Sequence, residues 1–472
     1  MTEREKCKKS GRVYTPDFIV RNVLDMSGYY GVNIVRKNVI DNSCGDGAFL
    51  CEIVDRYCIQ AIRDGRNPDA LKKELENYIH GIDVDEAECD KCIENLNTVA
   101  LKYGIKGVLW DIKNTDALSY NEFDGRMDFV LGNPPYVRVH NLEGLFDEAK
   151  SFSFAKSGMT DLYIVFYEIG IKMLNSRGVL GYITPSSFFT SVAGEYMRNV
   201  FVRENLLDKV IDMKHFRAFD ATTYSAIVVL DKKKKYCTEY YEFDNDSHIP
   251  QFVDTLLVSD YFIDGKFFFS EKTKLQTLKM IFTQEKDCSV AVKNGYATLC
   301  DEVYITDYQS KFTIPVIKAS RGETRNMIYP YDKNGNAFSE EQLKQDGKVY
   351  GQLLKNKSRL AKRNNDKAAQ QCWYAYGRSQ AIGDTYKNKV AMNAMIRTTD
   401  DLKLVDAPSG TGVYGGLYLV AEPDILKAAK KALEDTDFQE YVSLLGKYKS
   451  GGYYTFSSKD VKTYLDYKIA KQ

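Results

Sequence analysis

The sequence lacks a long apolar run. None of its hydrophobic segments reaches the length of a membrane-spanning helix, and its polar first residues, MTEREKCKKSG, contain no apolar core of a signal peptide. Its formal net charge is zero, with 65 basic and 65 acidic residues, so the overall charge predicts no partner. These absences argue against a membrane protein and favour a chain that works in the cytoplasm.

Paired cysteines and clustered histidines are missing as well. The ten cysteines have no disulfide-like spacing, which is typical of reduced thiols in a cytoplasm. Cys89 and Cys92 are the only close pair, but the segment 84–96 has a helical pattern and no second pair completes a zinc site. The four histidines are scattered, which argues against a Ser-His-Asp site. We therefore expect no metal and no catalytic triad.

Short apolar strands alternate with helical patterns between residues 37 and 231. The strand candidates span residues 38–41, 78–83, 107–112, 127–132, 178–184, 209–214 and 224–231. The helix candidates between them span residues 49–62, 85–104, 161–174 and 194–205. This alternation predicts an α/β fold with a doubly wound, mostly parallel sheet. No helix-length segment separates the last two strands, so the final strand is a candidate for an antiparallel one.

The length of 472 residues predicts more than one domain. The alternation ends in a charged stretch at 231–250, so we expect a first domain at 1–240 and a separate α+β domain at 245–472. Between Gly351 and Arg397 ten basic residues face only two acidic ones, and aromatic residues are interleaved with them. This pattern favours a surface for a polyanion over an ordinary solvated helix face. The candidate contacts are Lys355, Lys357, Arg359, Arg363 and Arg378.

A glycine-containing loop, DNSCGDGAFL (41–50), follows the first strand. Gly45 and Gly47 let the backbone pass close to a ligand before a helix begins. Leu50 occupies the third position of the dinucleotide fingerprint, and no Walker lysine is present. Asp83 ends the second strand, where a carboxylate suits the two hydroxyls of a ribose, and Asp116 follows the third, where it suits the amine of an adenine. Together these residues predict a pocket for an adenosyl group without phosphates.

The fourth strand ends in Asn133-Pro134-Pro135-Tyr136. Prolines cannot continue a strand ladder and fix the backbone, so this segment displays its neighbours rigidly. The side-chain oxygen of Asn133 and the carbonyl of Pro134 are two acceptors that fit the two hydrogens of an exocyclic –NH2 group. Tyr136 offers a face for the planar ring that bears this amine.

In these motifs and in their order, residues 11–231 resemble the gamma-class amino-methyltransferases of bacterial restriction–modification systems, which methylate adenine N6 in DNA. GRVYTPDFIV (11–20) resembles the segment that closes over the methionine part of S-adenosylmethionine, with Thr15 as a contact. Asp83 matches the ribose-binding acid, and Asp116 matches the residue at the adenine amine of the cofactor. Phe166 matches the ring that packs against the cofactor adenine, and Phe219 matches the aromatic residue that packs on the flipped target base.

The resemblance implies a seven-stranded S-adenosylmethionine-dependent methyltransferase sheet with a reversed last strand. It implies these cofactor contacts: Thr15, Asp41, Ser43, Cys44, Gly45, Gly47, Phe49, Asp83, Val84, Asp116, Ala117, Asn133, Pro135 and Phe166. It assigns catalysis to Asn133, Pro134, Pro135 and Tyr136, and stacking on the target base to Tyr136 and Phe219. Segments 292–305, 314–326 and 373–380 look more loosely like the recurring parts of a C-terminal target recognition domain.

The sequence thus predicts a monomeric, site-specific adenine-N6 methyltransferase of double-stranded DNA in the bacterial nucleoid. A restriction endonuclease encoded separately would be its partner. Methylation of cytosine N4, of RNA or of a protein glutamine side chain remains an alternative, because each presents an –NH2 group. A DNA-binding specificity protein without catalysis is the alternative from another class.

Overall fold

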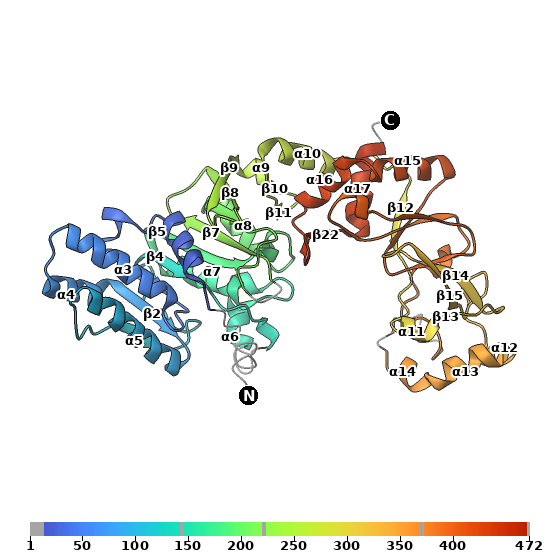
Figure 1. The fold of residues 1–472 in the computed structure, drawn as a ribbon, viewed down its shortest axis with the longest axis horizontal. Coiled ribbons are helices and arrows are strands. Elements are labelled where there is room, and N and C mark those ends of the chain that lie inside the picture. Colours follow the sequence, from blue (N-terminus) through green and yellow to red (C-terminus); the bar gives the residue numbers. More distant parts are fainter. Residues whose placement is uncertain are drawn as a thin grey trace. The chain divides into compact units, whose positions relative to one another are not determined.

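The chain folds into two compact units, Met1–Gln276 and Thr277–Gln472 (Figure 1). The structure is a computed structural model and describes residues 14–141, 146–219, 223–363, 365–367, 370 and 372–469. Residues 11–13 and 220–222, which belong to two of the family-like motifs, lie outside this range.

In the described part of the first unit, nine strands form one sheet in the order β3-β2-β1-β4-β5-β7-β6-β8-β9. The strands are β1 (Val39–Asp41), β2 (Ile79–Asp83), β3 (Asp111–Asn114), β4 (Met127–Gly132), β5 (Leu174–Pro185), β6 (Leu207–Asp212), β7 (Ser225–Asp231), β8 (Cys237–Phe243) and β9 (Pro250–Leu257). The strands from β3 to β5 pair in parallel, whereas β7 is antiparallel to both of its neighbours. The parallel sheet and its reversed seventh strand are as the sequence predicts.

Two expectations about this unit need correction. The sheet has nine strands instead of seven, because β8 pairs in parallel with β6 and β9 extends the edge. Consequently the first unit ends at Gln276, later than the boundary at 240–245 that the sequence predicts. The charged stretch at 231–250 therefore lies within the first unit, and in it Lys235 forms ion pairs with Asp208 and Asp231.

Nine helices have their N-terminus in the described part of the first unit, and two of them, α4 (Pro68–Tyr78) and α5 (Glu86–Lys102), begin with a side-chain cap. The nine are α2 (Asp17–Met26), α3 (Ala48–Arg63), α4 (Pro68–Tyr78), α5 (Glu86–Lys102), α6 (Phe146–Ser151), α7 (Leu162–Met173), α8 (Glu195–Arg203), α9 (Val258–Tyr261) and, across the boundary, α10 (Lys272–Phe282). The Asp85 carboxylate accepts from the backbone of the first turn of α5, and Asn67 does so for α4. Helix α4, with Pro68 at its first position, is an element that the sequence analysis missed. Among these helices α3 packs against both α2 and α5, and α7 packs on β4 and β5 (Figure 1).

The described residues of the second unit form three small sheets with helices around them. One sheet has the order β12-β20-β16-β18, another β13-β15-β14-β19, and the third β17-β22-β21. Their strands are β12 (Ala291–Asn294), β13 (Ile305–Thr306), β14 (Thr313–Lys318), β15 (Glu323–Ile328), β16 (Lys389–Met392), β17 (Met395–Ile396), β18 (Leu404–Ala407), β19 (Gly412–Tyr414), β20 (Leu417–Val420), β21 (Tyr448–Lys449) and β22 (Tyr453–Thr455). Gly415 and Gly416 form the turn between β19 and β20, and Gly412 lies within β19.

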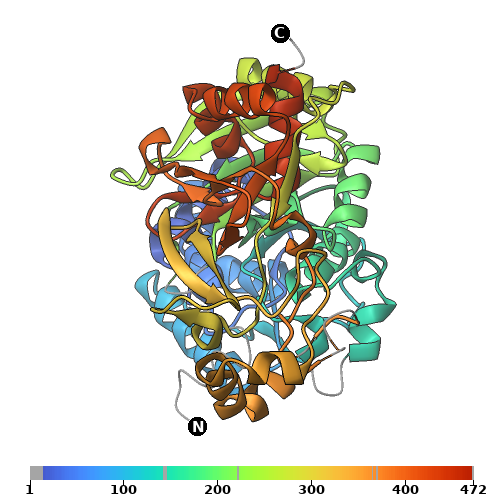
Figure 2. The ribbon, with the colours of Figure 1, turned by 90° about the vertical axis from the view of Figure 1, so that its right-hand side faces the viewer.

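Helices account for much of the rest of the second unit. They are α11 (Asp301–Tyr304), α12 (Glu340–Lys344), α13 (Gly347–Lys355), α14 (Lys357–Ala361), α15 (Pro423–Leu433), α16 (Thr436–Leu444) and α17 (Ser458–Ile469). Helices α15 and α17 lie side by side near the C-terminus (Figure 1 and Figure 2). Within the described residues, no helix combines the length and the apolarity that crossing a bilayer requires.

Gly47 is the residue on which the turn into α3 depends. Its φ of 90° lies in the left-handed region, and a Cβ atom there would approach Cys92 Sγ to 2.8 Å. We expect Gly47→Ala to lower the free energy of unfolding by about 2–4 kcal/mol, from the backbone penalty plus overpacking. Gly45→Ala is the matched control, since Gly45 also has positive φ but no atom within 4 Å of an added Cβ. Urea unfolding of both variants checks this, and equal losses would contradict it.

Candidate cofactor and amine pocket

A cavity of about 260 Å³ opens at the carboxyl ends of the central strands of the first unit. Most of the residues that the sequence predicts for the cofactor and for catalysis line it: Thr15, Asp41, Ser43, Cys44, Gly45, Phe49, Asp83, Val84, Asp116, Ala117, Asn133, Pro134, Pro135, Tyr136 and Phe166. Ligands of open α/β sheets bind at this edge because the loops that follow neighbouring parallel strands converge there. Residues far apart in the sequence are therefore brought together as expected.

The loop after β1 is held against the end of β2 by backbone and carboxylate hydrogen bonds. The Cys44 N–H donates to the Ile82 carbonyl at 2.9 Å, and the Gly45 N–H donates to Asp83 Oδ2 at 2.9 Å. The other oxygen of Asp83 accepts from the Asp85 N–H at 2.9 Å. Asp83 thus lies at the pocket wall in a fixed orientation.

Asp41 is a buried carboxyl group at the wall of the pocket. Its side chain is 2% exposed, and the Ser43 N–H donates to its Oδ1 at 3.0 Å. Burial raises the pKa of Asp41 from 3.8 to about 8; the hydrogen bond from Ser43 opposes this shift, and the nearby Asp83 carboxylate adds to it. Gly132 makes room for this group, because a Cβ atom there would lie 2.5 Å from Asp41 Oδ1.

The Asn133 side chain is oriented by a contact from the far N-terminal part of the unit. Its Nδ2 donates to Thr15 Oγ1 at 3.0 Å, and the Ser43 hydroxyl donates to the Asn133 backbone carbonyl at 3.3 Å. The amide nitrogen is thereby directed toward Thr15, and the amide oxygen points to the opposite side of the group. Three segments, at residues 15, 43 and 133, therefore meet at the residue that the sequence makes the centre of the chemistry.

Tyr136 is fixed at both its hydroxyl and its ring. Its hydroxyl donates to the Ile183 carbonyl on β5 at 3.0 Å, and burial raises its pKa well above the usual value, so it remains a neutral donor. The ring stands edge-on to Phe219 and to Tyr163, with centroids 6.0 and 6.2 Å apart. Phe219 itself does not line the cavity, but its ring contacts the Tyr136 ring in this edge-on arrangement.

Gly47 is the cofactor candidate that the cavity excludes. It caps α3 and packs on Cys92, so its role in the structure is the turn described above. Cys44 does line the cavity, but contact with the Cys92 thiol and burial raise its pKa well above the ordinary value. A protonated, buried thiol is a poor nucleophile. Cys89 and Cys92 both lie buried on helix α5.

Several residues at the cavity were not foreseen. Glu88 lies in the first turn of α5, and Leu162 begins α7. Leu162 stands four residues before Phe166, so the two share one helix face, and this spacing was the signal that could have found it. No comparable pattern in the sequence marks Glu88.

The basic residues predicted to contact DNA lie in the second unit and have unequal surroundings. Lys355, Lys357 and Arg359 are exposed, although Arg359 also pairs with Glu302. Arg363 instead donates to the carbonyls of Leu360, Thr298, Trp373 and Ala375. These bonds hold the chain around α14 together, so this guanidinium acts within the fold. Arg378 is half-buried and donates to the Gly377 carbonyl.

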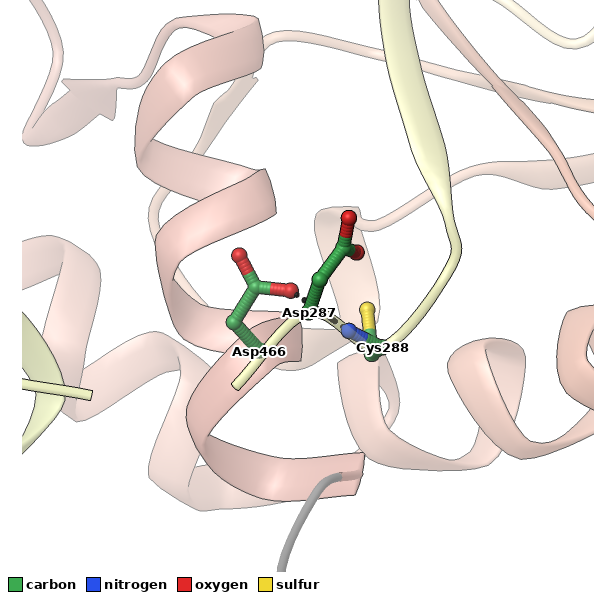
Figure 3. Close-up of side chains that lie close together, drawn as sticks. All are labelled: Asp287, Cys288 and Asp466. Carbon is green, nitrogen blue, oxygen red and sulfur yellow. Dashed lines mark hydrogen bonds between the residues drawn. The ribbon is translucent and has the colours of Figure 1, made fainter. Parts of the chain in front are cut away.

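One cluster in the second unit has metal-ligand residue types. Ligand atoms of Asp287, Cys288 and Asp466 lie within 4.8 Å of one another (Figure 3). The Cys288 N–H donates to Asp466 Oδ1 at 2.9 Å, and the Lys462 ammonium donates to Asp287 Oδ1 at 2.7 Å and also to Asp466. Burial raises the pKa of the Cys288 thiol to about 11. The Lys462 ammonium pairs with both carboxylates, so the cluster is an ion-pair network that ties α17 to the segment before β12.

The raised pKa of Asp41 has a consequence for stability. Below about pH 4 the carboxyl is protonated in the folded and unfolded chains alike; between pH 4 and 8 only the unfolded chain ionises, so stability is lost as the pH rises. We expect the urea midpoint of Asp41→Asn, measured relative to that of wild type, to be higher at pH 8 than at pH 5. An unchanged difference across this range would contradict the buried, neutral state of Asp41.

Comparison with known proteins finds similarity to enzymes of restriction–modification systems. Residues 49–219 match the family described as Eco57I restriction-modification methylase. The chain is similar to the type II methyltransferase M.BstVI of Geobacillus stearothermophilus, at 24% identity over 77% of this chain and 74% of that protein. It is also similar to the type II restriction enzyme and methyltransferase RM.Eco57I of Escherichia coli, at 24% identity over 78% of this chain but 47% of the relative.

Among solved structures the fold is similar to the type IIL restriction-modification enzyme MmeI, determined in complex with DNA. The TM-score is 0.65 at 12% identity, and the match covers 93% of this chain and 63% of MmeI. The chain thus spans less than two thirds of MmeI and about half of RM.Eco57I. Residues 49–219 are thus similar to the restriction-modification methylases of this family, whose methyl donor is S-adenosylmethionine.

Proposed function

We propose that this chain is a site-specific DNA methyltransferase that acts on the N6 amine of adenine. The observation that supports it most strongly is the convergence in one cavity of Asn133-Pro134-Pro135-Tyr136 with the two strand-end acids Asp83 and Asp116. The acids and the loop after β1 suit an adenosyl cofactor, and the rigid Asn-Pro segment suits an amine-bearing planar substrate. The similarity to relatives named as type II methyltransferases also supports this proposal.

The cavity residues fit S-adenosylmethionine, which supplies an electrophilic methyl group when it is bound. Asp83, whose orientation two backbone N–H groups fix, would accept from the ribose hydroxyls. Asp116 has one oxygen engaged with the Leu118 N–H at 2.9 Å and would accept from the adenine amine with the other. Phe166 would pack on the adenine ring. The positive charge of the bound ligand would lower the pKa of Asp41, because a nearby cation favours the ionised form of a buried carboxyl group.

The target base must leave the helical stack to reach such a cavity. Tyr136 would stack on the extruded ring, and Phe219 would support the tyrosine from behind. The Asn133 side-chain oxygen and the Pro134 carbonyl would accept the two N–H bonds of the base amine. This pairing favours a pyramidal nitrogen, so its lone pair leaves conjugation with the ring and becomes available for bond formation. The acceleration would come from positioning and from acceptors aimed at the positive charge that develops on nitrogen.

We assign target recognition to residues 277–472. The support is the set of exposed cations Lys355, Lys357 and Arg359, together with the similarity of the fold to MmeI, which was solved with DNA. Double-stranded DNA would then be the macromolecular partner. Action as a monomer, with a separately encoded restriction endonuclease, completes the proposal.

The amide of Asn133 is the residue to test first. We expect Asn133→Ala to lower N6-adenine methylation by at least about a hundredfold, since it removes one of two acceptors in the reaction geometry. Modification-sensitive sequencing of DNA from a methylation-deficient host that expresses the chain should show N6-methyladenine at one short motif. That signal should be lost in Asn133→Ala and kept in the surface control Asn121→Ala.

Two further measurements complete this test. Calorimetric binding of S-adenosylmethionine to Asn133→Ala shows whether the pocket stays intact. Methylcytosine in place of methyladenine would overturn the choice of base, and unmodified DNA from cells rich in folded wild-type protein would overturn DNA as the substrate.

The exposed lysines give a second prediction. The double variant Lys355→Gln/Lys357→Gln should bind DNA more weakly whatever the sequence and should flatten the dependence of log K on log salt by roughly one unit for each phosphate contact that is lost. Lys431→Gln, an exposed lysine on α15, is the control. Fluorescence anisotropy at several salt concentrations measures both slopes. Equal slopes for the double variant and wild type would contradict these contacts.

A further inference from the structure

Two large apolar side chains are exposed to solvent beside the cavity. Met159 is 71% exposed and Val192 is 67% exposed, although both lie in the enzyme-like first unit. The loops that carry them touch: a Cβ atom at Gly158 would lie 3.5 Å from Val192 Cγ1 and 3.3 Å from the Ala193 nitrogen. Beneath them, the Phe154 ring contacts Tyr196 with centroids 6.0 Å apart. Met159 and Val192, here called the apolar tips, therefore lie on two loops that contact each other.

Both loops start from the walls of the cavity. The chain that bears Met159 pairs with the segment after Tyr136, since the Leu162 N–H donates to the Val137 carbonyl at 2.7 Å and the Val139 N–H donates to the Thr160 carbonyl at 2.9 Å. Leu162 and Val137 line the cavity. The loop that bears Val192 follows β5, whose Ile183 carbonyl holds the Tyr136 hydroxyl. The apolar tips are thus a few residues from the place where the target base would sit.

Buried polar groups hold each loop in shape. The Thr160 hydroxyl, on a residue that is 2% exposed, contacts the carbonyls of Ala155 and Ser157 at 3.3 and 3.1 Å. Arg198 is 3% exposed, and its guanidinium donates to the carbonyls of Phe188 and Ser191 at 2.6 and 2.8 Å. Because the two loops are held in shape, covering these apolar side chains on binding would bury apolar surface without first ordering the loops.

The surroundings of the apolar tips suit nucleic acid. The exposed cations Arg138 and Lys156 lie on the same two strands of chain, Arg138 opposite Asp161 and Lys156 three residues before Met159. Apolar residues that enter a duplex act as wedges between base steps, while neighbouring cations contact the phosphates. A gap of one base is what extrusion of the target adenine would create in the duplex.

From this arrangement we infer that Met159 and Val192 enter the base stack of the DNA and fill the space that the extruded adenine leaves. The apolar tips are positioning residues in this scheme, because they contact the stack and not the reacting amine. The inference rests on the proposed function, since it requires a DNA base as the substrate. It adds a step to that function: extrusion is promoted by a preformed wedge next to the cavity.

The experiment compares Met159→Ala/Val192→Ala with wild type on unmethylated duplexes that contain the motif identified by sequencing. One duplex carries 2-aminopurine at the target position to report extrusion by its fluorescence. Two others carry adenine there, one correctly paired and one opposite a mismatched base, which is extruded at lower cost. Leu109→Ala is the matched control, because Leu109 is 79% exposed in the same unit and does not line the cavity.

We expect the double variant to lose at least half of the 2-aminopurine signal and about tenfold to a hundredfold in kcat/KM on the paired duplex. On the mismatched duplex its kcat/KM should return to within about threefold of wild type. Asn133→Ala should show the opposite pattern, with extrusion intact and no rescue by the mismatch. A double variant with wild-type extrusion, or a loss that the mismatch does not relieve, would overturn the wedge alone. A wild-type protein without turnover on the paired duplex would instead overturn the proposed function.

Discussion

The hydrogen bond from the Gly45 N–H to the Asp83 carboxylate joins the loops that follow β1 and β2. Both oxygens of Asp83 are engaged with backbone, at Gly45 and at Asp85. The same loop continues through Gly47 into α3, where the absence of a side chain lets α5 approach through Cys92. The position of the cavity wall, the start of α3 and the packing of α5 therefore depend on one carboxylate and one glycine turn.

A short series of hydrogen bonds connects this cavity wall to Asn133. Ser43 contacts Asp41 with its N–H and the Asn133 carbonyl with its hydroxyl, and Asn133 contacts Thr15 with its amide nitrogen. Gly132 allows the end of β4 to pass the buried Asp41 carboxyl. A shift in the loop after β1 would consequently move the Asn133 amide. The residues suited to the cofactor and those suited to the amine form one structural unit, as expected when methyl donor and acceptor must meet in a fixed geometry.

The cavity could be predicted well from the sequence, because its candidate site residues follow strands with a clear apolar pattern. The parallel strands β1, β2 and β4 lie within one residue of their predicted spans, so Asp83 and Asn133 fall at the expected edge. The third strand was placed too early, because the apolar residues at 107–110 precede the strand itself. Strands β8 and β9 were missed since their charged and aromatic residues hide the alternation of a sheet edge. Arg363 was counted as a surface cation because a charge run does not reveal which guanidinium bonds to carbonyls.

The described residues that line the cavity all lie between Tyr14 and Phe166, within the first unit. The cavity that we assign to the methyl donor and to the amine is therefore lined by described residues of the first unit. If the second unit selects the DNA sequence, selection and chemistry are encoded in separate stretches of the chain. Base extrusion would then connect selection with chemistry, since DNA held by the second unit must deliver a single base to the first. If the apolar tips promote extrusion, that link lies on the first unit, and a change in the recognized sequence would leave the extrusion step itself unchanged.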